Sequence, residues 1–308
     1  MDIIDIKNYK EIIRKSRENY FKTPYDLVSE NFVNLKYNKH PKEYFFENAS
    51  IIVETLRSKC WDSYKPLEKK FTSEMLKKLV DIDKINKLSS IEAISFFIEE
   101  FPEHIYALSL SNTQSRRSRA GKEFESIIEH ILIGAELPLD SQGNVGKKIF
   151  LDKGLGKLVD VVLPGVLEYF LNKRNTVLIS AKTTLRERWQ EVPEEMGRTG
   201  AREMFLATMD TTISSDVLNT LYEANIQVTT TRNIKDKYYH DNNRVLTFED
   251  LLRICSTVTD CWDDYNYSDD EKKQVQNLLN KQIDKHKNHE FIKNYYIKRL
   301  KELKQKKL

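Results

Sequence analysis

The sequence predicts an α/β protein, with a mixed sheet flanked by helices, a helical N-terminal portion and a helical C-terminal tail. Two observations lead to this prediction. In the middle of the chain, short β-branched segments bounded by Gly, Pro or Asn alternate with helical segments. On both sides of that region, apolar residues recur at three- and four-residue spacing, which is the period of an amphipathic helix. A chain of 308 residues can hold one large domain or two modest ones.

Residues 1–108 form the predicted helical N-terminal portion. The helical period is visible in five segments, and Ser90 is a suitable N-cap for the last of them. The five segments are 7–20, 25–37, 41–64, 72–88 and 90–101.

Residues 109–267 form the predicted core. The polar, arginine-rich stretch 111–122 is interpreted as a loop, followed by a helix that buries Phe124, Ile127, Ile128, Ile131 and Leu132. Five strands and a helix at about 214–224 complete the core. The strands are KKIFLD (147–152), KLVDVVLPG (157–165), TVLISAK (176–182), MFLAT (204–208) and IQVTTT (226–231).

Residues 268–308 form a basic helical tail. From Glu271 to Leu308 there are 12 Lys/Arg and 4 Asp/Glu, so this segment has a charge of +8, whereas the whole chain has +3. The first 270 residues therefore carry −5. A basic tail beside an acidic body is compatible with a polyanionic partner, and a solvated lysine-rich helix explains the tail equally well.

Other broad classes are disfavoured by the composition. No stretch approaches the roughly 20 apolar residues of a membrane span, and the N-terminus lacks the apolar run of a signal peptide. Three cysteines without metal-site spacing indicate reduced thiols, and hence a cytoplasmic protein.

Two charged residues accompany neighbouring predicted strands. Asp160 lies within the apolar run 158–163, and Lys182 ends the strand 176–182. A carboxylate in such a run is unfavourable unless it lies at a strand end or binds a cation. A purely structural ion pair and a functional site are equally compatible with these two residues alone.

Two further acids favour the functional interpretation. Glu195 follows Lys182 by 13 residues, and Glu125 is adjacent to the apolar helix face at Phe124. Converging carboxylates with a lysine are typical of Mg²⁺-dependent phosphodiester hydrolysis, in which the metal polarises the phosphate and activates water. The sequence thus predicts Asp160, Glu195 and Glu125 as metal ligands and Lys182 as the group that serves the attacking water.

This arrangement resembles the PD-(D/E)XK nucleases, with one departure. The usual second acid, two residues before the lysine, is replaced by Ser180. In the type II restriction endonucleases related to EcoRII and NgoMIV, that acid has moved to the following helix, and Asp160, Lys182 and Glu195 match this displaced pattern. The resemblance implies a sequence-specific double-strand endonuclease.

The cluster Arg186-Glu187-Arg188 matches the branch's motif for reading CCGG half-sites. Arginine can bind guanine O6 and N7, and glutamate can accept from cytosine N4. Thr184 and Glu187 could instead form a capping box that needs no DNA. Gln114, in the predicted loop, is a further candidate for base contacts, and Arg116, Arg117, Arg119 and Lys122 are candidates for phosphate contacts.

Over most of its length the chain resembles the SsoII-type members of this branch, which cut before the first C of 5′-CCNGG. The resemblance implies that the central base pair is flipped out, and Arg57 and Trp61, four residues apart on one helix, are suited to stack on flipped bases. Taken alone, a Trp on an amphipathic helix is more often a core residue. This clamp does not distinguish CCNGG from CCWGG.

A near-palindromic target cut on both strands implies a homodimer, with the C-terminal helices as one candidate interface. Two other functions fit the same fold: a DNA-binding protein that has lost catalysis, and a structure-specific nuclease such as a junction resolvase. The first would retain the Arg-Glu-Arg cluster without needing Glu195, and the second would not need the cluster.

Overall fold

The protein is described by a computed structural model that covers residues 4–305, apart from the side chains of Glu187 and Arg188. Its sheet has six strands in the order β1-β2-β3-β4-β5-β6. The pairs β1–β2 and β2–β3 are antiparallel, and β3 to β6 are parallel. The strands are β1 (Asp140–Ser141), β2 (Val161–Leu163), β3 (Val177–Lys182), β4 (Met204–Thr208), β5 (Ile226–Thr230) and β6 (Val245–Thr247).

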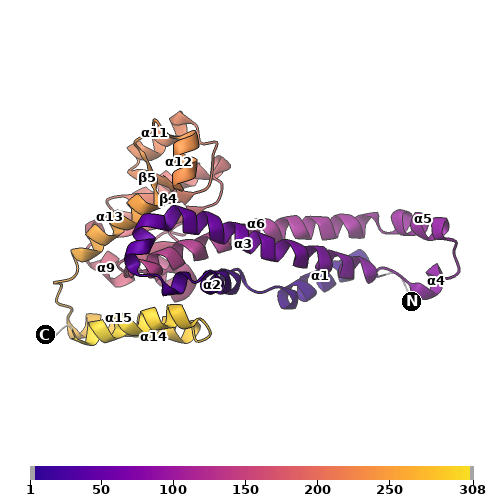
Figure 1. Ribbon diagram of the computed structural model, residues 1–308, viewed down its shortest axis with the longest axis horizontal. Helices are drawn as coiled ribbons and strands as arrows, with labels where there is room; N and C mark the ends of the chain where they lie inside the picture. The colour runs from indigo at the N-terminus through magenta and orange to yellow at the C-terminus, as the bar shows by residue number, and fades with distance from the viewer. Residues whose placement is uncertain (1–3, 306–308) are drawn as a thin grey trace.

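Helices cover both faces of this sheet (Figure 1). Successive side chains of β3 alternate between the two faces: Ile179 packs in one hydrophobic core and Leu178 in the other. The α-helices that contribute most of the Ile179 core are α2 (Pro24–Asn34), α3 (Lys42–Lys77), α6 (Pro102–Gly134), α13 (Phe248–Asp260), α14 (Asp269–Lys285) and α15 (Glu290–Gln305), and Leu167 joins it from α9 (Val166–Leu171). Those that contribute to the Leu178 core are α7 (Gln142–Val145), α8 (Lys147–Asp152), α9, α10 (Glu191–Thr199), α11 (Ser215–Glu223) and α12 (Arg232–Tyr238). Three 3-10 helices, η1 (Tyr37–Lys39), η2 (Lys173–Asn175) and η3 (Arg186–Gln190), complete the connections.

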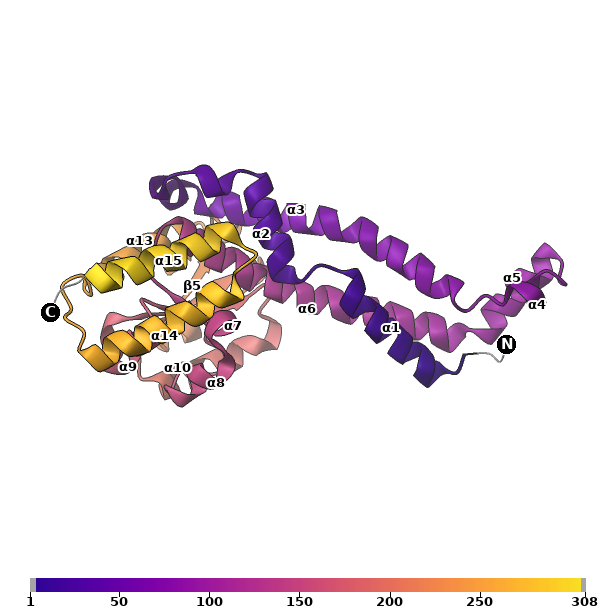
Figure 2. The same cartoon turned by 90° about the horizontal axis from the view of Figure 1, so that it is seen from below.

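A long helical arm extends from the sheet region (Figures 1 and 2). It is built from α1 (Ile6–Tyr20) and the outer parts of α3 and α6, with α4 (Ile82–Ile85) and α5 (Ser90–Glu100) at its far end. A third hydrophobic core holds it together, and includes Tyr9, Phe71 and Phe101. The helix α6 runs without interruption from the arm into the layer beside the sheet, so it joins residues 1–108 to the core.

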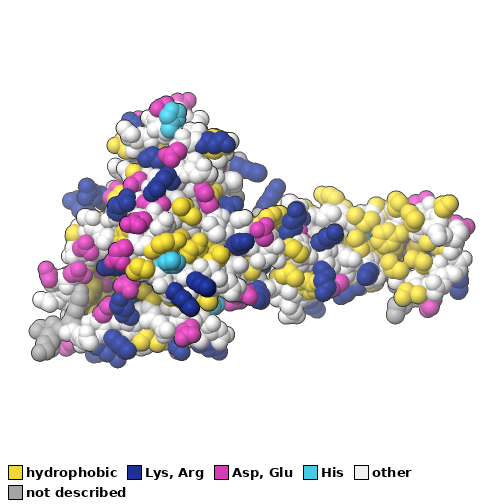
Figure 3. Space-filling view, viewed as in Figure 1, with side chains coloured by type: hydrophobic (Ala, Val, Ile, Leu, Met, Phe, Trp, Pro, Cys, Tyr) yellow, Lys and Arg dark blue, Asp and Glu magenta, His cyan; other side chains and the backbone are white. Residues whose placement is uncertain are grey.

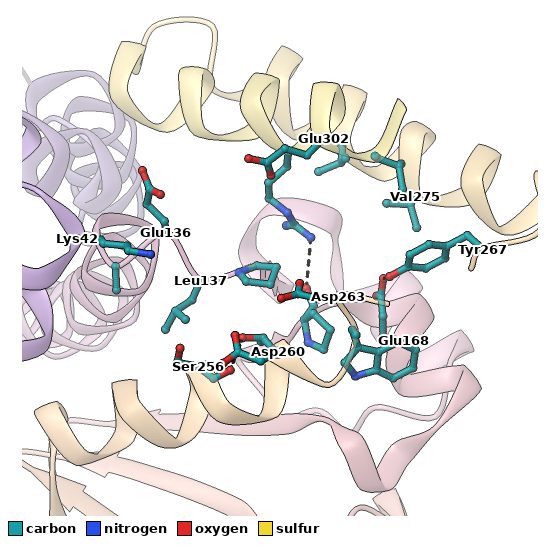
Figure 4. A pocket seen from close by; sticks show the side chains of 18 of the residues that line it. Lys42, Glu136, Leu137, Glu168, Ser256, Asp260, Asp263, Tyr267, Val275 and Glu302 are labelled. Atoms are coloured by element: carbon teal, nitrogen blue, oxygen red, sulfur yellow. Dashed lines mark hydrogen bonds between the residues drawn. The ribbon is translucent and has the colours of Figure 1, made fainter. Parts of the chain in front are cut away.

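The C-terminal helices α14 and α15 pack on the core through their apolar faces, which bury Leu279, Ile292 and Tyr296. Polar contacts reinforce this packing: the Tyr267 hydroxyl donates to Glu168 at 2.6 Å, and Gln282 Nε2 donates to Asp140 at 2.8 Å. A cavity of about 300 Å³ remains between the tail and the core, and its lining includes the carboxylates of Glu136, Glu168, Asp260, Asp263 and Glu302 (Figure 4).

The structure confirms the α/β class, the helical N-terminal portion and the helical tail, and corrects four details. The segment 147–152, predicted as a strand, is helix α8. Two short strands at the edges, β1 and β6, were not predicted, so the sheet has six strands instead of five. The N-cap of α5 is Ser89, which forms a capping box with Glu92, and Ser90 is the first helical residue.

The segment 111–122, predicted as a loop, lies inside α6. Its polar residues contact the neighbouring helices of the arm: Asn112 Nδ2 donates to Thr72 Oγ1 at 2.9 Å, and the Arg116 guanidinium pairs with Glu68. A helix face that packs through polar groups lacks the apolar period on which the prediction relied. No described helix has an apolar stretch long enough to cross a membrane.

Candidate active site

Asp160 and Lys182 meet at one end of the antiparallel pair β2–β3. Asp160 immediately precedes β2, Lys182 is the last residue of β3, and antiparallel pairing brings these two positions together. Lys182 Nζ donates to Asp160 Oδ2 at 3.2 Å, and the same oxygen accepts the Ala181 backbone N–H at 2.7 Å. Their side chains are only 15% and 14% exposed, so the pair is largely removed from water.

Glu125 lies beside this pair. It is on α6, which packs against β3, and Glu125 and Asp160 line the same cavity of about 370 Å³. Phe124 and Ile128 are fully buried on the same helix, as predicted, and this packing fixes the rotation of α6. Lys122, one turn before Glu125, also lines the cavity.

The two carboxyl groups influence each other. Burial, and then the nearby Asp160 carboxylate, raise the pKa of Glu125 to about 7, although Lys182 and Lys122 act in the opposite direction. Burial also raises the pKa of Asp160, against the effect of Lys182 and of the Ala181 N–H. Two crowded, buried carboxyl groups are a suitable environment for a cation.

Glu195 approaches the same segment from another direction. It is on the buried face of α10 with Val192 and Met196, and its Oε1 accepts the Leu158 backbone N–H at 3.3 Å. Gly156 makes this approach feasible, because a Cβ at that position would lie 1.4 Å from Glu195 Oε1. Glu195 thus contacts the backbone two residues before Asp160. Among the described residues, no three His, Cys, Asp or Glu side chains are grouped closely enough to hold a metal ion as they stand.

Ser180 occupies the position where PD-(D/E)XK nucleases usually carry their second acid. It is fully buried, and its hydroxyl has no hydrogen-bond partner among the described residues. Because it is inside the core, Ser180 cannot serve as a ligand for a group bound at the cavity.

The chain after Lys182 is held by Asp210, which follows the neighbouring parallel strand β4. Asp210 Oδ2 accepts the Leu185 N–H at 2.8 Å, and Oδ1 accepts the Thr212 N–H at 2.9 Å. Burial alone would raise the pKa of Asp210, but hydrogen bonds from Leu185, Thr212 and the Arg186 backbone keep it below its usual value.

Arg186 begins η3 with an exposed side chain and a left-handed backbone, with φ of +45°. Such a backbone is uncommon for a residue with a Cβ, and here the Asp210 hydrogen bonds accompany it. The predicted base-reading side chains of Glu187 and Arg188 lie outside the described residues, as does the Glu187 half of the predicted capping box.

Arg57 and Trp61 lie on α3 as predicted, four residues apart. Trp61 is 43% exposed, which is more than a core tryptophan would be. The Arg57 guanidinium lies 6.0 Å from the centre of the Phe124 ring, adjacent to Glu125, and its Nη1 is buried without a hydrogen-bond partner among the described residues. Burial lowers the pKa of Arg57, and Glu123 partly compensates.

Gln114 and Arg117 are exposed on α6, so both are accessible to a partner. Two of the arginines predicted to meet phosphates are instead engaged within the arm. Arg116 pairs with Glu68. Arg119 is 12% exposed, donates to the Lys22 carbonyl at 2.9 Å and lies over the Tyr64 ring. The structure therefore argues against a phosphate contact for Arg119.

Two residues near the site were not predicted. Asp210 could have been found from the parallel pairing of β3 and β4, because the carboxyl ends of parallel strands meet at one sheet edge. Glu129 is one helical turn after Glu125, and its buried Oε1 accepts from Tyr25 and Asn144, both at 2.7 Å. Both lie close to predicted residues in the fold.

The arrangement supplies oxygen ligands for a hard divalent cation, a lysine ammonium beside them and an exposed arginine a few residues away. Carboxylate oxygens are the ligands that Mg²⁺ prefers, and the metal commonly retains several waters. A water near the Asp160–Lys182 pair would meet both a proton acceptor and a positive charge. This chemistry suits hydrolysis of an anionic ester.

Comparison with known proteins identifies related restriction enzymes. A family model described as the EcoRII C terminal matches residues 82–252. The chain is 50% identical over 292 residues to the type II restriction enzyme SsoII from Shigella sonnei, a match that covers 95% of this chain and 96% of that protein.

Solved structures of restriction endonucleases bound to DNA are also similar to this chain. Metal-depleted Ecl18kI in complex with uncleaved DNA is 48% identical, with a TM-score of 0.91 over 97% of this chain and 100% of that chain. A second Ecl18kI complex, with uncleaved, modified DNA, has a TM-score of 0.92. The PspGI–substrate DNA complex is 16% identical, with a TM-score of 0.59 over 84% of this chain and 98% of that chain, and so shares the fold.

Proposed function

The chain belongs to the EcoRII C-terminal family of type II restriction endonucleases, and on this basis we propose that it cleaves both strands of DNA at 5′-CCNGG with Mg²⁺ as cofactor. Cleavage before the first C leaves 5′-phosphate ends and a five-nucleotide 5′ overhang. The observation that carries the proposal is the buried Asp160–Lys182 contact, with Glu125 on the same cavity and Arg186 four residues after the lysine.

The residues present fit a magnesium ion. Asp160 and Glu125 offer carboxylate oxygens on one cavity, and Glu195 supplies the acid that Ser180 lacks, by turning from the Leu158 N–H towards Asp160. When bound, the ion polarises the scissile phosphate and lowers the pKa of a coordinated water. Lys182 orients the attacking water and stabilises the negative charge that develops on the phosphate.

Arg186 and Arg188 read the guanines of each half-site, and Glu187 accepts from the paired cytosines. This assignment is supported by the exposure of Arg186 and by its position directly after the proposed catalytic lysine. Gln114, exposed on α6, adds a base contact from the arm. Substitution Arg186→Ala should reduce discrimination between CCNGG and altered sites by about 1–3 kcal/mol.

The central base is flipped out and stacks between Arg57 and Trp61. Recognition residues spaced for the contiguous sequence CCGG can contact both half-sites of CCNGG only if the extra central base pair leaves the helical stack. The proposal is supported by the partial exposure of Trp61 and by Arg57 Nη1, which has no hydrogen-bond partner among the residues that the structure describes; both residues lie on one face of α3. Since every base has a π-face, such a clamp accepts any central base.

Two copies of the chain act together, because a near-palindromic duplex cut on both strands calls for two symmetric active sites. A cytoplasmic location agrees with the three free cysteines, of which Cys60 and Cys255 are buried.

Plasmid cleavage followed by sequencing of the ends tests the activity. With Mg²⁺, discrete ends at CCNGG are expected, whereas without it the plasmid should stay intact. Binding to CCNGG without cleavage in Mg²⁺ would favour a DNA-binding protein that has lost catalysis. Cleavage only at junctions or flaps would favour a structure-specific nuclease.

Glu195→Ala tests the displaced acid. This variant should lose cleavage by at least about 1000-fold, as expected when transition-state stabilisation of several kcal/mol is removed, and should still bind a CCNGG duplex. Glu194→Ala, on the same helix but exposed, is the matched control and should cut normally. Cleavage by Glu195→Ala at the wild-type rate would remove Glu195 from the metal site.

A further inference from the structure

Three lysines surround the cavity that holds the proposed catalytic residues. Lys122 comes from α6, Lys147 from α8 and Lys285 from α14, and all three line the cavity of about 370 Å³ that Asp160 and Glu125 also line. The three lysines are exposed, and together they form the basic rim of this cavity. Because they come from three separate elements, it is the fold that brings them together.

The interior of the cavity is acidic, in contrast to its rim. Glu129 is 4% exposed and Glu125 is partly buried, and burial raises the pKa of both carboxyl groups. Lys122 acts on Glu125 in the opposite direction, and Lys285 does so on Glu129. A polyanion that approaches the cavity would therefore meet positive charges before it meets the carboxylates.

The lysines of the basic rim have no carboxylate partner. None of the three forms a salt bridge with a residue that the structure describes, whereas Lys298, also in the tail, lies 2.7 Å from Glu136. Lys285 Nζ donates to the Gly143 carbonyl, which uses one of the three donors of an ammonium group. Burial lowers the pKa of Lys285, and Glu129 partly compensates. A phosphate at the cavity would supply the contacting negative charge that this ammonium lacks.

The C-terminal tail reaches the cavity through the segment 140–145. Its helix α7 contacts both α14 and α8, and Figure 2 shows these three helices as neighbours. The Gln142 backbone N–H donates to the Asp160 carbonyl at 2.8 Å, and Gly143, the partner of Lys285, is the next residue. Backbone contacts thus fix the position of this part of the tail relative to Asp160.

The net charge of the tail does not by itself identify a binding surface. Over the C-terminal helices, Figure 3 shows lysine and arginine side chains among carboxylates. Attraction by the total charge would be shared by every lysine of the tail, whereas a direct contact belongs to particular residues. Lys285 and Lys301 separate the two cases, because both are exposed on the tail and Lys285 lines the cavity.

We propose that Lys122, Lys147 and Lys285 bind phosphates of the DNA strand that is cut, at and beside the scissile bond, and that the C-terminal tail is thereby part of the DNA-binding surface. The inference rests on the proposed function, since the cavity is the proposed site of cleavage. Phosphate contacts position a duplex without reading its sequence. The basic rim would hold the strand in place while Arg186 reads the bases.

The salt dependence of binding tests these contacts. Binding of the full chain to a CCNGG duplex is measured without divalent metal, over about 50 to 200 mM salt. Each of Lys122→Met, Lys147→Met and Lys285→Met should reduce the magnitude of the slope of log K against log[salt] by about 0.9, and raise Kd about 3- to 10-fold, because one phosphate contact is lost. The ratio of the affinities for CCNGG and for an altered duplex should not change.

The matched controls remove the same charge at other positions. Lys148→Met lies on the same helix as Lys147, and Lys301→Met lies on the same tail as Lys285; both residues are exposed. Each control should keep the wild-type slope and Kd, and circular dichroism checks that every variant is folded. Controls that reduce the slope as much as Lys147→Met and Lys285→Met do would show that total charge is responsible, and would overturn the proposal.

An uncharged methylphosphonate at a single position locates each contact. At the scissile phosphate or beside it, this replacement should raise Kd of the wild type about 3- to 10-fold. At one of these positions it should have no further effect on Lys285→Met, because the partner charge has already been removed. The same should hold for Lys147→Met. Full, additive losses in both variants at every position near the cut would refute the contacts.

Cleavage of CCNGG is recorded separately. A wild type that cuts at this site, while the lysine variants keep the wild-type salt slope, would refute the basic rim and leave the function intact. A wild type that does not cut, but whose salt slope the lysine substitutions reduce, would refute the function and retain the basic rim as a DNA-binding surface. A wild type that binds no duplex would overturn both.

Discussion

At the scale of single residues, Asp210 connects the sheet to the segment that carries Arg186. Its carboxylate receives N–H groups from the loop after β3 and from the loop after β4. An amide at this position keeps the shape but adds two donors where acceptors are needed. The positions of Lys182 and Arg186 relative to each other therefore depend on a negative charge that contacts neither DNA nor metal in the proposed mechanism.

Asp210→Asn should lower both cleavage and specificity. Losing charge-assisted hydrogen bonds of about 1–3 kcal/mol should slow cleavage at CCNGG by about 10- to 100-fold. The ratio of the cleavage rate at CCNGG to the rate on a duplex with one altered half-site base should also decrease. Cleavage rates on the two duplexes measure this. Asp216→Asn, exposed on α11, is the control. A variant that loses thermal stability but keeps the wild-type preference would reduce Asp210 to a structural role.

Trp61 should report on the central base. With 2-aminopurine at the centre of CCNGG, binding of the wild type should change the fluorescence of the flipped base, and Trp61→Ala should alter that signal because the stacking partner is gone. Trp61→Phe, which retains an aromatic face, should stay close to the wild type. An identical signal from wild type and Trp61→Ala would mean that the base does not stack on this residue.

At the scale of elements, three histidines join α2, α6 and the C-terminal helices. His130 Nδ1 donates to the Ser126 carbonyl at 2.7 Å and its Nε2 accepts from Ser29 at 2.9 Å, so the neutral ring satisfies both nitrogens. His286 is equally buried and contacts His289. Burial is the largest cause that lowers the pKa of His130 to about 4 and that of His286 to about 3.

This cluster predicts a loss of stability in acid. A histidine with a native pKa near 4 and an unfolded value near 6.5 is neutral when folded, so stability is complete above pH 6.5 and falls as the pH drops towards 4. At pH 5 the protonation of His130 in the unfolded state alone should lower the free energy of unfolding by about 2 kcal/mol relative to neutral pH. Urea unfolding at pH 7.5 and at pH 5 measures this free energy. Between these two pH values, the His130→Gln variant should lose less of its free energy of unfolding than the wild type. Equal losses in both proteins would contradict the assignment.

The elements that the sequence could predict were those stabilised by an apolar period. Strands β2 to β5 and the helices around Ile13, Leu56 and Ile128 bury such residues. The segment 111–122 is helical because polar groups, among them Asn112 and Arg119, contact other helices, and no apolar pattern records such contacts. In the segment 147–152 only Phe150 is buried. A single buried residue shows neither the two-residue period of a strand nor the period of a helix, so the sequence could not distinguish the two.

At the scale of the whole molecule, the predicted site residues come together to different degrees. The contact of Asp160 with Lys182 was predicted from the positions of these residues at the ends of neighbouring strands. The approach of Glu125 was predicted from its position next to Phe124 on the apolar helix face. The direction of the Glu195 side chain depends on Gly156 and the Leu158 N–H, which come from a loop that no period describes. The arm, which carries Trp61 and Gln114, became apparent only from the packing of α3 against α6.

In the proposed function, two copies of the chain act in a single reaction, and each contributes one buried sheet edge that binds the metal and one exposed segment that reads the bases. Mapping the cut on both strands of a duplex that contains one CCNGG tests this most directly. With Mg²⁺, each strand should be cut before its first C, giving 5′-phosphates and a five-nucleotide overhang, while a duplex with CCGG in its place should stay intact. Cuts at other positions, cleavage of one strand only, or equal cleavage of both duplexes would contradict it.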